Sequence, residues 1–134
     1  MATRKQRFDA YRTIINDATS RPFEYGTNDC VLLIARAVRA ITGVDYAPAF
    51  QPYDVRSAAR LLRNAGGLVP FISQFLGEPE TDTSQLRVCD AVVVSSVGQD
   101  AAAGLWNGQS VTCLAASGAI GVSAMHIDAF WRIG

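Results

Sequence analysis

The hydrophobic pattern of this chain changes about two thirds of the way along, from helical spacing to short β-branched runs. Before that point apolar residues recur every three to four positions, as in Phe8, Tyr11 and Ile14, which is typical of one face of a helix. After it, the run Ala91-Val92-Val93-Val94 favours a strand, because β-branched side chains pack well on a pleated surface. Helices and strands are therefore segregated rather than alternating, and the pattern predicts an α+β fold.

The elements expected from these patterns are four helices followed by five strands. The helices are expected at about residues 5–18, 29–42, 54–64 and 69–76. The strands are expected at about residues 91–94, 103–106, 109–114, 120–124 and 129–133. Asn107-Gly108 predicts a type I′ hairpin turn between the second and third strands. With 134 residues and no linker-like stretch, we expect one domain over residues 1–134.

Caps and inward faces can be assigned for the two helices with the clearest ends. Thr27 or Asn28 is expected to cap the second helix at its start, and Gly43 to close it. In the third helix, Leu61 is expected on the inward face together with Ala58 and Leu62.

The composition argues against several classes of function. The formal net charge is zero, so no strongly basic surface is expected and nucleic acid is not predicted as a partner. No apolar stretch has the length of a signal peptide core or a membrane span, which predicts no membrane insertion and a chain made in the cytoplasm. Three cysteines and one histidine without a Cys-x-x-Cys pair predict no disulfide framework, no metal site and no cofactor.

Cys30 is the strongest candidate for a catalytic residue in the sequence. It lies at the first turn of the expected second helix, where the helix dipole and free backbone N–H groups stabilise a thiolate. The same N–H groups are suited to an oxyanion that forms during acyl transfer. The alternative is a small buried hydrophobic residue on a core-facing stripe, which is common for free cysteine. Both interpretations stay open from the sequence.

The residues before and including Cys30 carry a resemblance to a known family. The segment reads Phe-x-Tyr-Gly-x-x-Asp-Cys, formed by Phe23, Tyr25, Gly26, Asp29 and Cys30. It resembles the nucleophile segment of NlpC-type cell-wall cysteine peptidases, which are papain-like enzymes that cleave peptide bonds in peptidoglycan stems. The resemblance implies a papain-like α+β fold with helices packed on an antiparallel sheet of about five strands.

Two later segments are similar to further motifs of that family. The stretch around Cys89 and Asp90 resembles the family's Gly-Asp strand, with Cys89 in place of the glycine. The hairpin that starts at Ala102 resembles its His-Val-Gly-Ile strand, with Ala102 in place of the catalytic histidine. We therefore expect the second helix to lie against the sheet, with Cys30 facing this hairpin.

A phage-associated branch of the superfamily, encoded among tail genes, is more similar still. Its shared features include a Thr-Gly helix end, a Gly-Gly-Leu stretch and a closing Ala-x-Trp-Arg, here Thr42-Gly43, Gly66-Gly67-Leu68 and Ala129, Trp131 and Arg132. This resemblance implies a virion component of the tail, assembled in the host cytoplasm, with other tail proteins and possible peptidoglycan contact as its partners.

The chain departs from the family at two polar positions. Ala102 can neither take the thiol proton nor protonate a leaving amine, and both steps are needed for cysteine acyl transfer. Phe23 stands where the family often has a tyrosine whose hydroxyl helps the oxyanion. These departures predict a catalytically impaired module.

Four other residues are candidates for the site. His126 is the single histidine and a candidate base, with Asp128 as the candidate group that orients it; the alternative is an exposed loop histidine. Tyr25 and Asp29 are candidates for substrate binding, and Asp29 is alternatively a cap of its own helix.

Three functions remain open from the sequence. The first is an impaired papain-like component of a phage tail tip, which acts in assembly or cell-wall contact. The second is an active virion-associated peptidoglycan endopeptidase that uses Cys30. The third is a peptidoglycan-binding module that keeps the cleft without the chemistry.

Overall fold

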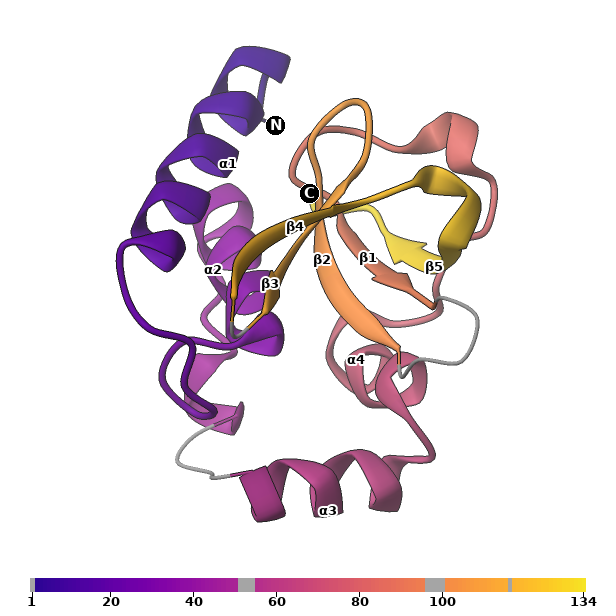
Figure 1. Ribbon diagram of the computed structural model, residues 1–134. Coiled ribbons are helices and arrows are strands. Elements are labelled where there is room, and N and C mark those ends of the chain that lie inside the picture. Colours follow the sequence, from indigo (N-terminus) through magenta and orange to yellow (C-terminus); the bar gives the residue numbers. More distant parts are fainter. Residues whose placement is uncertain (1, 51–54, 96–100, 116) are drawn as a thin grey trace.

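The computed structural model describes residues 2–50, 55–95, 101–115 and 117–134. It is an α+β structure in which four helices precede and pack against a five-stranded antiparallel sheet, as the sequence pattern predicts (Figure 1). No helix in the described ranges has both the length and the apolar character that crossing a bilayer requires.

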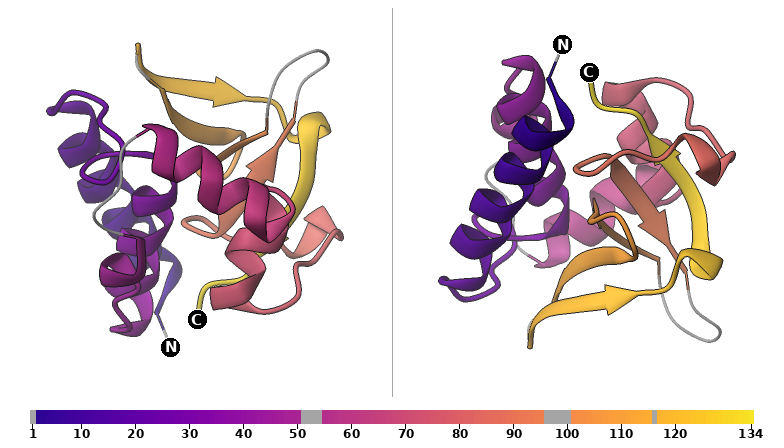
Figure 2. Two further views of the ribbon diagram at one scale, coloured as in Figure 1. Left: turned by 90° about the horizontal axis from the view of Figure 1, so that it is seen from below. Right: turned by 90° about the horizontal axis from the view of Figure 1, so that it is seen from above.

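The first two helices lie side by side and form the layer next to the sheet (Figure 2). Helix α1 runs over Arg4–Thr19 and begins at a capping box between Thr3 and Gln6. Helix α2 runs over Cys30–Thr42 and ends at Gly43, whose φ of 82° is the left-handed conformation predicted for this stop.

The next two helices form a pair that is separated by a double-glycine turn. Helix α3 runs over Val55–Ala65 and α4 over Leu68–Leu76; the expected start of α3 at residue 54 lies outside the described residues. The N–H groups of Gly66 and Gly67 both bond to the carbonyl of Leu62 and so end α3. The inward position predicted for Leu61 is wrong: its side chain is 39% exposed, because α3 contacts little besides the short α4.

The sheet has the strand order β4-β3-β2-β1-β5, and all neighbours are antiparallel. The strands are β1 Ala91–Val94, β2 Ala102–Trp106, β3 Val111–Ala115, β4 Gly118–Val122 and β5 Ile127–Trp131. β4 and β5 each begin two residues earlier than expected, because the 3-10 turn Ala124–His126 occupies the residues between them.

The turn between β2 and β3 differs from the type I′ hairpin that Asn107-Gly108 suggested. It spans residues 107–110, and the pair Trp106 and Val111 closes it. The Asn107 side chain accepts hydrogen bonds from the N–H groups of Gln109 and Ser110, at 2.9 and 2.8 Å. Asn107 therefore acts as a side-chain cap of a four-residue turn, and a type I′ turn, which needs positive φ at both central residues, does not form.

Both faces of the sheet are buried, and each face packs against its own hydrophobic cluster. On the helical side, β-strand residues such as Leu105, Leu114 and Trp131 pack with the apolar side of α2 in the main core. On the other side Val92, Val94, Val111, Cys113 and Phe130 form a smaller cluster. The burial of the whole first half of α2, from Val31 to Ala35, confirms the prediction that this end of the helix lies in the core.

A buried ion pair joins α1 to the start of the sheet. Arg7, 3% exposed, donates from Nη2 to Asp90 Oδ1 at 2.5 Å, from Nε to the Val88 carbonyl and from Nη1 to the Ile133 carbonyl. Asp90 is fully buried and also accepts from the N–H groups of Arg87 and Ile133. We call this ion pair with its hydrogen bonds the Arg7–Asp90 clasp. Each acceptor named here has a donor, and the clasp links the first helix to the segments before β1 and after β5.

Candidate active site around Cys30

The loop that leads to Cys30 is fixed by one buried amide. Asn28 is 1% exposed, and its Nδ2 donates to the carbonyls of Ala18, Arg21 and Pro22 at 2.9 to 3.3 Å. Its backbone exchanges two hydrogen bonds with Glu24. Asn28 was expected as a possible helix cap, but the structure gives it this loop-holding role instead.

The cap of α2 is Asp29. Its Oδ1 accepts from the Leu32 N–H at 2.9 Å, and its Oδ2 accepts from the Gly26 N–H at 2.8 Å. The interpretation of Asp29 as the cap of its own helix is therefore confirmed, and the prediction that Thr27 or Asn28 caps it is wrong by one or two positions. Asp29 is 2% exposed, so both oxygens serve the fold and the side chain has no open path to a substrate.

Cys30 begins α2 and is half-buried against β2. The pairing of β2 with β3 ends at Gly104 and Cys113, whereas its pairing with β1 continues to Ala102. The sheet thus opens between β2 and β3 at this end, and the backbone N–H of Ala103 approaches the Cys30 thiol. Cys30 faces the strand that the sequence predicted, and Ala103 is its neighbour there.

The electrostatics of the site favour the neutral thiol. Burial, together with the nearby Asp29 carboxylate, raises the pKa of Cys30 to about 11. The backbone N–H groups of Ala103, Cys30 and Val31 act in the opposite direction and lower the pKa, as expected at a helix N-terminus. Burial and the adjacent negative charge outweigh these donors, so the thiol stays protonated at neutral pH.

Ala102 belongs to the other face of the sheet. Its methyl group packs against the smaller cluster that contains Val94 and Cys113, whereas Cys30 packs against the main core. The position that resembles the family's histidine thus offers neither a titratable group nor a side chain directed to the thiol.

His126 and Asp128 lie at the β5 edge of the sheet, where the turn Ala124–His126 links β4 to β5. His126 is half-buried in the 3-10 turn before β5, and its carbonyl accepts from the Ser95 N–H. β1 lies between β5 and β2, and two strand spacings amount to roughly 10 Å. Asp128 is exposed, and no ion pair joins it to His126 in the described part of the chain. Among the described residues, no hydrogen bond or ion pair joins Cys30, His126 and Asp128.

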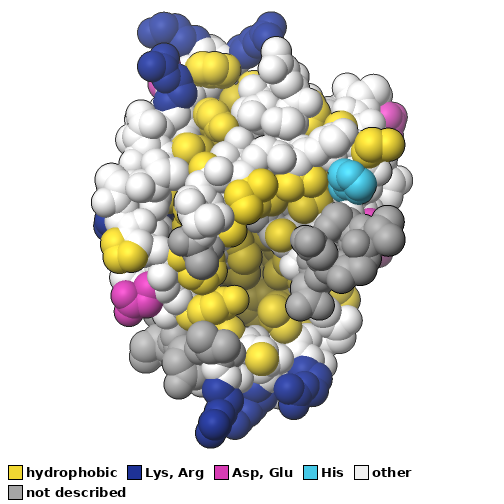
Figure 3. Space-filling model, viewed as in Figure 1, with side chains coloured by type: hydrophobic (Ala, Val, Ile, Leu, Met, Phe, Trp, Pro, Cys, Tyr) yellow, Lys and Arg dark blue, Asp and Glu magenta, His cyan; other side chains and the backbone are white. Residues whose placement is uncertain are grey.

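The face shown in Figure 3 carries a hydrophobic hollow near its centre, and the single histidine lies at the surface beside it.

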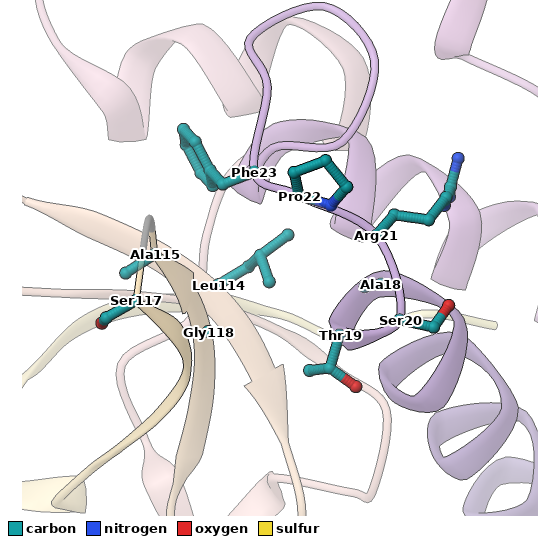
Figure 4. Close-up of a pocket in the computed structure, with 10 residues that line it drawn as sticks. All are labelled: Ala18, Thr19, Ser20, Arg21, Pro22, Phe23, Leu114, Ala115, Ser117 and Gly118. Atoms are coloured by element: carbon teal, nitrogen blue, oxygen red, sulfur yellow. The ribbon is translucent and has the colours of Figure 1, made fainter.

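Tyr25 is 39% exposed, and its ring stands edge-on to that of Phe23 with the centroids 5.0 Å apart. Phe23 in turn lines a cleft of about 340 Å³ between the loop after α1 and the β3–β4 hairpin, where it lies across from Leu114 (Figure 4). Among the described lining residues the one charged side chain is Arg21, which pairs with Asp17 at 2.8 Å, and none of them is suited to acid–base chemistry.

The other two cysteines are buried, Cys113 in β3 and Cys89 in the turn just before β1. Burial raises the pKa of Cys89 to about 12 and that of Cys113 to about 11. Cys89 has a φ of 75°, a left-handed conformation that glycine adopts most easily. Among the described residues, no cluster of histidine, cysteine or acidic side chains is suited to a metal ion.

The sequence matches one protein-family model over residues 3–133, and its description is "Domain of unknown function (DUF6950)". The chain belongs to this family. No curated protein matches the chain. The match covers nearly all of the chain, so the helices and the sheet belong to one family domain, and the family's description assigns no activity to it.

Proposed function

We propose that this protein is a component of a phage or phage-like tail tip, built on an NlpC-type papain-like framework with impaired catalysis. It acts in tail assembly or in contact with the cell wall, and other tail proteins are its main partners. Its place of action is the virion, after assembly in the host cytoplasm.

The order of elements supports this proposal. A helix that begins with a cysteine precedes an antiparallel sheet and packs on it, which is the layout that the NlpC-type resemblance implies. The Tyr25 to Cys30 segment forms one closed loop and helix start, held by Asn28 and Asp29, as a nucleophile segment would be.

The observation that carries the impaired catalysis is the state of the Cys30 thiol. Cysteine acyl transfer needs a thiolate, a base that takes its proton and an acid that protonates the leaving amine. Burial and Asp29 raise the pKa of Cys30 to about 11, and His126 belongs to the turn before β5, a strand that β1 separates from β2. Ala102 supplies no titratable group. The framework of a nucleophile site is present without its proton-transfer groups.

Two experiments test the proposal together. Purified peptidoglycan stem peptides incubated with the protein should show no hydrolysis above that of Cys30→Ala, as measured by mass spectrometry. Tail particles assembled without the protein should be defective, and both the parent and Cys30→Ala should restore them. A protein that tail components neither bind nor require would contradict the proposed role.

One observation favours the alternative of an active endopeptidase. The N–H groups of Ala103, Cys30 and Val31 surround the Cys30 sulfur, and such donors are what an oxyanion hole needs. This alternative requires measurable hydrolysis by the parent, with complete loss in both Cys30→Ala and His126→Ala. Hydrolysis that survives either substitution would refute it.

A further inference from the structure

A cavity of about 390 Å³ lies between the first turn of α1 and the segment before β1. Cys30 is not among the residues that line it. The polar side consists of three arginines and the apolar side of three larger hydrophobic residues: Arg4, Arg7 and Arg87, and Leu86, Val88 and Trp106. We call it the arginine pocket. Its volume lies within the range of small-ligand sites in proteins.

The arginine pocket has more positive than negative charge. None of its described lining residues is acidic. The nearest carboxylate, Asp90, is buried; it accepts from Arg7 at 2.5 Å and lies 3.7 Å from Arg87. Asp90 thus lies close to two guanidinium groups, Arg87 also donates to an oxygen of the last residue, Gly134, and Arg4 adds a third positive charge.

Two of the arginines have donors that the fold does not use. The Nε of Arg87 is buried and has no hydrogen-bond partner in the described structure, while its Nη2 bonds to the carbonyls of Ile133 and Gly134. A buried donor without an acceptor is costly. Arg4 has no recorded partner among the described residues and stands in a first helical turn that contains no acidic side chain. A cation at this end of a helix is unfavourable, and a bound anion would relieve the unfavourable position of Arg4.

We propose that the arginine pocket binds an oxyanion, a carboxylate or a phosphate, that is carried on an apolar body. Arg4 and Arg87 line the pocket and supply charge-assisted hydrogen bonds to the anion. Leu86, Val88 and Trp106 supply the wall for the apolar part. The inference does not depend on Cys30, so its test is independent of the test of the proposed function.

The pocket contains a site-specific probe for the test. The indole N–H of Trp106 reports on the arginine pocket, whereas the indole N–H of Trp131 donates to the Gly77 carbonyl elsewhere and serves as the internal reference. The ¹⁵N-labelled protein is titrated at constant ionic strength with N-acetyl-leucine, with N-acetyl-leucinamide and with inorganic phosphate. The first and third probes distinguish a carboxylate from a phosphate ligand, and the amide lacks the charge.

We expect a saturable shift of the Trp106 indole signal with at least one of the two anions, and none with the amide. Arg4→Gln should weaken that binding at least ~10-fold, and Cys30→Ala should leave it unchanged. Arg12→Gln is the matched control, because Arg12 is an exposed arginine on the same helix outside the pocket. The proposal is overturned if neither anion gives a saturable shift, if the amide binds equally well, or if both arginine variants lose affinity equally.

Discussion

The Arg7–Asp90 clasp gives the sharpest test of how this fold is held together. Arg7→Met keeps much of the aliphatic volume but removes the guanidinium, which leaves the fully buried Asp90 carboxylate without its cation. The carbonyls of Val88 and Ile133 lose a donor at the same time. Removing one partner of a buried ion pair costs about 3–5 kcal/mol. We expect a loss of that size in the free energy of unfolding.

Urea unfolding and calorimetry measure this loss, and the double variant identifies its cause. If the cost is mainly that of an unpaired buried charge, Arg7→Met/Asp90→Asn should be more stable than the sum of the single effects predicts, by about 0.5–3 kcal/mol. Arg12→Met, an exposed control on the same helix, should change stability by less than about 0.5 kcal/mol. A cost below ~1 kcal/mol for Arg7→Met, or strict additivity in the double variant, would refute this account.

Three further predictions follow from the site and the sheet. Gly104→Ala should destabilise the fold by about 1–3 kcal/mol, because a Cβ there would lie 2.4 Å from the Thr112 carbonyl oxygen. The control is Gly121→Ala, where the nearest atom to an added Cβ is 3.7 Å away. Equal unfolding midpoints for the two variants would disprove the close approach at Gly104. Asp29→Ala should cost about 1–2 kcal/mol through the lost helix cap, and no change in thermal unfolding would contradict that role. The raised pKa of Cys30, about 11 against an ordinary 9.0, means that the unfolded chain loses this proton first as pH rises. Stability should therefore fall between pH 9 and 11, less steeply in Cys30→Ala, and equal slopes for the two proteins would count against the shift.

The helices and strands can be predicted from the sequence because each depends on residues that are close together in the chain. The apolar spacing in α1 and α2 and the β-branched run in β1 place each element within a residue or two of its observed bounds. The turn after β2 was mispredicted because the Asn107 side chain competes with the backbone for the N–H groups of the turn. The last two strands shifted because the 3-10 turn between them has no strong sequence signal.

The candidate site was predictable only in part. The position of Cys30 at a helix start follows from the residues around it, whereas the direction of its pKa shift depends on burial against β2, which is some 70 residues away. The same holds for the Arg7–Asp90 pair, whose partners are 83 positions apart. A single charged residue within an amphipathic pattern does not reveal a buried partner at that separation.

The most direct test of the central claim, that Cys30 keeps a nucleophile's position without its reactivity, is the pH dependence of its alkylation. Mass spectrometry follows Cys30 with Cys89 and Cys113 as internal references, and the urea-unfolded protein gives the rate of an ordinary thiol. With a pKa of about 11 against an ordinary 9.0, Cys30 should react roughly 90-fold more slowly at pH ~8 than an ordinary thiol. Its rate should still be rising at pH ~10. Rapid and selective alkylation of Cys30 at pH ~6 would show an activated thiolate and contradict the account.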